Sequence, residues 1–155
     1  MAQGNKPVEY KLLVENRRVR HEYALEDEFE AGLALLGSEV KSLRTGGGNL
    51  TESWIRIDPS GNAWLVGAHI APYTEANRLN HEPLRQRQLL LHRSELAKLG
   101  RGVRLRGLTV VPVKLYLKGS RIKLAIALAR GKKLHDKRES LKQRDAKREM
   151  DRARR

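Results

Sequence analysis

Arginine and lysine side chains gather at several places along this sequence, where they could neutralise the phosphates of a nucleic acid. The first cluster, Arg17, Arg18 and Arg20, stands between Asn16 and His21. A protein that contacts several phosphates releases their counterions, so its binding weakens steeply as salt rises. The other clusters are Arg85 with Arg87, then Lys114, Lys118, Arg121 and Lys123, and finally Lys132 with Lys133.

The overall charge indicates the same kind of partner. The 155 residues include 32 Lys and Arg against 18 Asp and Glu, which gives a formal net charge of +14. Such a balance favours a polyanion: nucleic acid first, an anionic membrane surface second. The tail has too few apolar residues to insert into a membrane, so we expect no membrane contact.

Few residues are arranged for catalysis or metal binding. The absence of cysteine excludes disulfide scaffolds, Cys-zinc sites and thiol enzymes, and no two of the five histidines have metal-ligand spacing. The glycines at 46–48 lack the rest of a phosphate-binding loop and predict a flexible turn. The acidic residues at 26–30 could suggest magnesium, but a solvated face is the better interpretation. We therefore expect no enzymatic activity, no metal and no cofactor.

The segments that must position the basic clusters are mostly strand-like. Residues 54–57 and 64–70 flank a Pro-Ser-Gly-Asn turn and predict a hairpin. Residues 108–117 and 122–129 predict two further strands, with Pro112 at an edge or a bulge. Both tryptophans lie in these expected strands and are assigned to the core.

Helical spacing is rarer. Residues 29–36 predict one short helix that ends at Gly37, and Ser94 predicts the start of another that ends near Gly100, before a short strand at 103–105. Many short strands with close turns and two or three short helices predict a mainly β fold, a small closed antiparallel barrel. We divide the chain into a flexible lead-in (1–13), the barrel (14–130) and a tail (131–155).

The tail has a composition of its own. Its 25 residues include eleven basic and five acidic side chains and only three large apolar ones, Leu134, Leu141 and Met150. It cannot bury enough apolar surface to offset its ordering entropy, so we expect disorder in the free protein. Oppositely charged residues at helical spacing favour a helix once the tail meets an anionic groove.

Five blocks in order resemble one family, the SmpB (SsrA-binding) proteins of bacteria. The blocks are Asn-Arg-Arg-Val-Arg-His-Glu-Tyr at 16–23, Phe-Glu-Ala-Gly at 29–32, Glu-Val-Lys-Ser-Leu-Arg at 39–44, Gly-Leu-Thr-Val-Val-Pro at 107–112, and Gly-Lys-Lys-Leu-His-Asp-Lys-Arg at 131–138. Four positions depart from the usual family pattern. Gly47 and Gln88 stand where basic residues are common, Glu82 stands where Asp is usual, and Ala146 stands where a bulky residue is common.

The resemblance implies an oligonucleotide-binding (OB-like) barrel that binds the tRNA-like domain of transfer-messenger RNA (tmRNA). It implies delivery of the charged RNA, with elongation factor Tu, to stalled ribosomes for trans-translation. The barrel would mimic an anticodon arm, and the tail would enter the decoding centre and the empty mRNA channel as a helix. We expect a cytoplasmic monomer. The alternative is a general RNA-binding or ribosome-associated protein without tmRNA specificity.

The resemblance also implies site residues. Glu30 is unusual beside a polyanion, and it could accept hydrogen bonds from the RNA or position a neighbouring arginine. Leu90 could pack on an unstacked base or could be a core residue. The barrel residues expected at the RNA are Asn16, Arg17, Arg18, Arg20, His21, Glu30, Leu90, Lys123, Lys132 and Lys133. The tail residues expected at the ribosome are His135, Asp136, Lys137, Arg138, Lys142 and Arg144.

Overall fold

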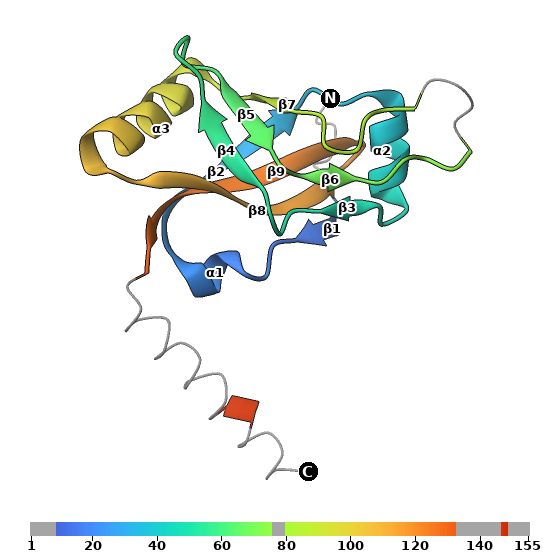
Figure 1. Cartoon of the computed structure of the whole chain (residues 1–155), viewed down its shortest axis with the longest axis horizontal. Helices are drawn as coiled ribbons and strands as arrows, with labels where there is room; N and C mark the ends of the chain where they lie inside the picture. Colours follow the sequence, from blue (N-terminus) through green and yellow to red (C-terminus); the bar gives the residue numbers. More distant parts are fainter. Residues whose placement is uncertain (1–8, 76–79, 133–146, 149–155) are drawn as a thin grey trace, which may run out of the picture.

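The fold is a large antiparallel sheet with three helices around it (Figure 1). The computed structural model describes residues 9–75, 80–132 and 147–148. Lys133 and the six tail residues expected at the ribosome, His135, Asp136, Lys137, Arg138, Lys142 and Arg144, lie outside the described residues. The expected disorder and helix formation of the tail therefore stay predictions.

Seven strands form the main sheet, and every neighbouring pair is antiparallel. In spatial order they are β1 (Tyr10–Glu15), β8 (Thr109–Lys118), β9 (Arg121–Gly131), β2 (Tyr23–Leu33), β7 (Arg87–Leu90), β5 (Ala63–Val66) and β4 (Trp54–Ile57). A separate two-stranded ribbon joins β3 (Gly48–Asn49) to β6 (His69–Ile70). The helices are α1 (Val19–Glu22), α2 (Gly37–Arg44) and α3 (Arg93–Arg106).

The expected closed barrel is wrong, because the two edge strands of the sheet, β1 and β4, do not pair with each other. The two-stranded ribbon lies against β1 instead: a Cβ on Gly48 of β3 would come within 2.7 Å of Val14 Cγ2. β3 pairs with β6 and not with β1, so the outer edge of β1 has no partner among the described strands. The mainly β class, the antiparallel arrangement and the number of helices are as expected.

The long β8–β9 hairpin is buried on both faces. Its inner face contributes Leu115, Leu124, Ile126 and Leu128 to the main core, as the alternation predicted. The outer face carries small residues, which leave room for α1 to pack against the sheet. The outer cluster joins Val19 of α1 to Val111, Val113, Tyr116, Ala125, Ala127 and Ala129.

Residues 29–33 belong to strand β2, so the helix expected over 29–36 is wrong. Their partners in β9 impose the alternation of a strand, with Glu30 opposite Ala125 and Ala31 opposite Leu124. Gly37 begins α2 and does not end a helix. The Leu36 N–H donates to Glu39 Oε1 at 2.8 Å, which satisfies one of the free donors at the start of α2.

Helix α3 is longer than expected at its C-terminal end. It continues through residues 103–105, where a strand was expected, and ends at Gly107, whose φ of +63° is the left-handed conformation of a helix C-cap. Gly102 allows the helix to approach the sheet, because a Cβ there would lie 2.7 Å from Leu128 Cδ2. Packing on the sheet therefore outweighs the low helix propensity of glycine.

Two smaller expectations also differ from the structure. β1 begins at Tyr10, inside the segment expected to be a flexible lead-in. Trp54 is half exposed on β4, and Trp64 is only partly buried and lies outside the core clusters, so the assignment of both to the core is wrong. Pro112 lies at a bulge of the interior strand β8, which confirms one of the two places expected for it, an edge or a bulge.

Candidate nucleic-acid interface

The outer face of strands β1, β8, β9, β2 and β7 carries three of the expected RNA-facing residues. Directly opposed residues of neighbouring strands point to the same side of a sheet. Lys123 is opposite Gly32, and Gly32 is also opposite Leu90. Glu30 lies two residues before Gly32 and shares its face. The structure therefore brings Glu30, Leu90 and Lys123 together on one side, which we call the outer face.

Glu30 accepts two hydrogen bonds on this face. The Tyr116 hydroxyl donates to Oε2, and Lys118 Nζ donates to Oε1 at 3.0 Å. The bond from Tyr116, followed by that from Lys118, lowers the pKa of Glu30 below its usual value. Burial and the bond to Glu30 raise the pKa of Tyr116, so its hydroxyl stays a donor. The residues positioned by Glu30 are thus a tyrosine and a lysine, not an arginine.

Tyr116 was missing from the expected site. It is opposite Lys123 on β9 and Leu12 on β1, so it stands in the middle of the outer face. Lys114 Nζ lies 5.7 Å from the centre of its ring, and Lys118 Nζ lies 5.9 Å from that of Tyr10. The alternation of β8 could have placed Tyr116 beside Lys114 and Lys118, but its partner Glu30 lies 86 residues away in the sequence.

Leu90 is exposed, which decides between its two interpretations. Its exposed fraction is 55% although it lies in the middle of the sheet. Gly32, its neighbour on β2, makes room for it: a Cβ on Gly32 would stand 3.2 Å from Leu90 Cβ. Leu90 is therefore available to pack on an unstacked base.

The cluster around α1 lies at the end of β1. Asn16 is buried: its Nδ2 donates to the Pro112 carbonyl at 3.0 Å, and its backbone N–H donates to Val113 O at 2.9 Å. Its side chain therefore fixes the turn that presents Arg17 and Arg18. Both arginines are exposed, and Arg18 forms only a loose ion pair with Glu52, at 3.7 Å.

Two further residues of this cluster have distinct environments. Arg20 is exposed and lies 3.7 Å from Glu28, a distance at which an exposed ion pair contributes little to stability. His21 is half-buried, and its Nδ1 has no hydrogen-bond partner among the described residues. Lys132 follows β9, and its backbone N–H donates to Glu22 O at 3.0 Å. The start of the tail is therefore tied to α1 and its arginines.

Arg85 and Arg87 do not form the phosphate-binding cluster that the sequence suggested. Arg87 is fully buried, and its Nε donates to Glu39 Oε2 at 2.5 Å while Nη1 donates to Ala68 O at 2.8 Å. Arg85 donates to the other oxygen, Glu39 Oε1, at 2.5 Å. Burial alone would raise the pKa of Glu39, but the bonds from Arg85, the Leu36 backbone and Arg87 outweigh it and lower that pKa. These arginines anchor α2 to β7.

The described residues contain neither a metal-binding cluster nor a membrane-spanning helix. Within 9–75, 80–132 and 147–148, no three His, Cys, Asp or Glu side chains lie together as a metal site would require. Among the helices described, none has the length and apolar character to cross a membrane.

Comparison with known proteins identifies the family. The family model "SmpB protein" matches residues 13–155. The chain is 53% identical over 143 residues to an SsrA-binding protein of Bifidobacterium longum (strain DJO10A), covering 92% of this chain and 90% of the relative. It is 54% identical over 144 residues to one of Thermosynechococcus vestitus, covering 92% and 94%.

A solved structure agrees with these relatives. A chain from "tmRNA-SmpB: a journey to the center of the bacterial ribosome" superposes with a TM-score of 0.66 at 42% identity, covering 88% of this chain and 95% of that one. The family model covers β2, β7, β8 and β9, the α1 cluster and the tail. This chain therefore belongs to the SmpB family of SsrA-binding proteins.

Proposed function

We propose that this protein binds tmRNA and helps to deliver it to stalled ribosomes in trans-translation. The single observation that carries the proposal is the outer face: Glu30, Tyr116, Lys118, Lys123 and Leu90 stand together on one side of the sheet, in a chain of the SmpB family. These residues support a role in binding and not in catalysis.

We infer that the outer face meets the tRNA-like domain of tmRNA. Lys123 and the lysines around Tyr116 would contact phosphates as mobile point charges. Leu90 would pack on a base that the folded RNA leaves unstacked, as RNA-binding surfaces commonly require. Glu30 would act by holding the Tyr116 hydroxyl and Lys118 in place, because both carboxylate oxygens already accept hydrogen bonds from them.

We assign the α1 cluster and the start of the tail to the same RNA-binding body. Arg17 and Arg18 project from a turn that Asn16 holds against β8, and Arg20 follows in α1. Lys132 lies at the end of α1, where its backbone N–H donates to Glu22 O. Exposed arginines on a fixed turn suit bidentate contacts to phosphate. His21, Lys132 and Lys133 would extend this contact towards the tail.

The remaining parts of the proposal follow the family. The sheet would serve as an OB-like RNA-binding body, standing in for an anticodon arm. The tail would read the decoding centre and mRNA channel through His135, Asp136, Lys137, Arg138, Lys142 and Arg144. The protein would act as a monomer in the cytoplasm, with elongation factor Tu joining through the charged RNA.

A competition titration at moderately high salt tests the proposal. Labelled tRNA-like domain is bound to the full chain and competed with ordinary tRNA and with an unrelated hairpin of equal length. Non-specific binding collapses as salt rises, whereas shape recognition persists. Retention of only the tRNA-like domain supports the proposal. Equal, salt-sensitive binding of all three RNAs would replace it with a general RNA-binding role.

A further inference from the structure

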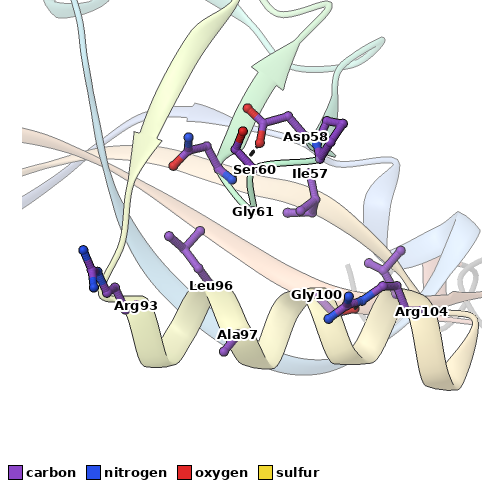
Figure 2. A pocket seen from close by; sticks show the side chains of 12 residues that line it. Ile57, Asp58, Ser60, Gly61, Arg93, Leu96, Ala97, Gly100 and Arg104 are labelled. Carbon is purple, nitrogen blue, oxygen red and sulfur yellow. Dashed lines mark hydrogen bonds between the residues drawn. The ribbon is translucent and has the colours of Figure 1, made fainter.

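A groove of about 740 Å³ separates helix α3 from the loop that joins β4 and β5 (Figure 2). Ile57, the last residue of β4, points towards the helix, and Leu96 points from the helix towards the loop. Val103 adds a third apolar side chain to the lining. The groove is distant from the outer face, because α3 packs on the inner face of the sheet, with Gly102 against Leu128.

The loop side of the groove is fixed in place. Asp58 Oδ1 accepts a hydrogen bond from the Asn62 N–H at 2.9 Å, and Oδ2 accepts one from Trp64 Nε1, also at 2.9 Å. The bond from Trp64, followed by that from Asn62, lowers the pKa of Asp58. Both oxygens of the one carboxylate that lines the groove are therefore already used to hold the loop.

The helix side of the groove is basic. Arg93 and Arg104 both line it, and neither forms an ion pair within the described part of the chain. Arg104 Nε donates to the Gly100 carbonyl at 3.3 Å, which lays the guanidinium along the helix within the groove. Over its length α3 has five basic residues and one acidic residue, so the groove favours an anion.

Gly100 lies between the two arginines on the helix and has no side chain to fill the groove. A Cβ there would meet only Arg104 Nη2, at 3.7 Å, so the space above Gly100 is open. The groove thus offers an apolar slot with a cation towards each end. A nucleotide has the matching chemistry, since a flat base packs on apolar side chains while its flanking phosphates pair with arginines.

We propose that this groove binds an unpaired stretch of RNA, with one base against Ile57, Leu96 and Val103 and phosphates on Arg93 and Arg104. An acidic peptide also carries anions, but the net charge of +14 and the proposed RNA partner favour RNA as the occupant. The site is separate from the outer face, so one protein could hold the folded tRNA-like domain and a single strand together.

The test uses the full chain saturated with the tRNA-like domain of tmRNA. A labelled eight-nucleotide single-stranded RNA is then titrated by fluorescence anisotropy at several salt concentrations. R93Q/R104Q removes the phosphate partners, and Gly100→Leu fills the slot without changing the charge. The matched control K98Q/R101Q removes the same charge from the same helix, at residues that do not line the groove.

We expect the single strand to bind the saturated protein. R93Q/R104Q should raise its Kd at least tenfold and lower the slope of log K against log salt by about 1.4, or about 0.7 per lost phosphate contact. Gly100→Leu should raise the Kd with an unchanged slope, and K98Q/R101Q should change it less than about threefold. Gly100→Ala, which adds only a Cβ, should fall between the wild type and Gly100→Leu, and it replaces Gly100→Leu if that variant does not fold.

Four results would overturn the proposal: no binding to the saturated protein, an equal effect of the control variant, tighter binding of an acidic decapeptide that depends on the same two arginines, or weaker binding of the tRNA-like domain itself to R93Q/R104Q. The last result would make the groove part of the contact with the folded RNA. The outcome is separable from that of the proposed function, because the outer face is tested by its own variants.

Discussion

Arg87 and Glu39 meet inside the protein, where the guanidinium Nε donates to the carboxylate Oε2 at 2.5 Å and neither side chain reaches solvent. One residue comes from α2 and the other from β7, 48 positions apart. Since Arg87 also donates to Ala68 O and Pro83 O, its charge and donors are largely satisfied. This pair fixes α2 against the sheet.

Arg87→Ala should destabilise the protein by about 3–5 kcal/mol, because it leaves the Glu39 carboxylate buried without its main partner. Urea denaturation at pH 7 measures the loss. Arg85→Ala is the matched control: Arg85 is one-third exposed and contacts the same carboxylate, so its removal should cost less. An equal loss of unfolding free energy in the two variants would contradict the idea that the buried Arg87 is the main partner of Glu39.

The same pair predicts a pH dependence of stability. The pKa of Glu39 is lower in the folded protein than in the unfolded chain, so its contribution is fully present above the unfolded value, near 4.5. The contribution is lost as the pH falls below 4.5 and through the lowered folded pKa. Urea midpoints of the wild type should therefore fall in this range more than those of Glu39→Gln. Parallel curves for the two proteins would argue against this contribution.

Glu30 should act on RNA through Tyr116. Glu30→Gln and Tyr116→Phe should each weaken binding of the tRNA-like domain, and the double variant should lose little more than either single one. The expected coupling free energy is about 0.5–3 kcal/mol, typical of residues within one hydrogen-bond network. Anisotropy titrations of the four proteins measure it. Strictly additive losses would mean that Glu30 contacts the RNA independently of Tyr116.

Lys123→Gln should weaken binding of the tRNA-like domain and lower the slope of log K against log salt by about 0.9, as the loss of one phosphate contact predicts. Arg44→Gln, at an exposed position in the last turn of α2, removes the same charge away from the outer face. It should leave the slope nearly unchanged. If the slope of log K against log salt is the same for the two variants, Lys123 does not contact a phosphate of the RNA.

Leu90→Ala should weaken RNA binding by about 1 kcal/mol, or roughly fivefold in Kd, because part of an apolar side chain no longer packs on a base. Its effect on stability should stay within about 0.5 kcal/mol, since the side chain is exposed. Leu84→Ala, with a similar exposed fraction of 57% against 55%, is the control and should change neither quantity. A stability loss of several kcal/mol would make Leu90 a packing residue.

Substitutions in the tail should abolish ribosome rescue and leave RNA binding by the sheet intact. Changing Asp136, Lys137 and Arg138 to Ala should leave the Kd for the tRNA-like domain within about twofold, because only one net charge is lost and salt screens its effect. The same variant should abolish tagging on stalled ribosomes in a reconstituted assay. The control changes Asp151, Arg152 and Arg154 to Ala and alters the charge equally. Equal loss of both activities in the first variant would contradict the division of labour.

The sequence by itself determined much about this protein. The net charge indicated a nucleic-acid partner, and alternation predicted the β8–β9 hairpin. Five ordered blocks identified the family, which the comparisons confirm. These features are local or compositional. Periodicity failed at residues 29–36, where apolar spacing fits both a helix and a strand, and only the partner strand β9 decides.

The tertiary structure decided which charges are available. Arg17 and Arg87 each belong to a basic cluster of the sequence. Arg17 is exposed on a turn, yet Arg87 is fully buried and paired with Glu39. It likewise brought Glu30 to Tyr116 across 86 residues and left the two edge strands, β1 and β4, without a pairing to each other. Such outcomes depend on contacts between distant segments, and a side chain's own type and neighbours in sequence do not specify which partner will bury it.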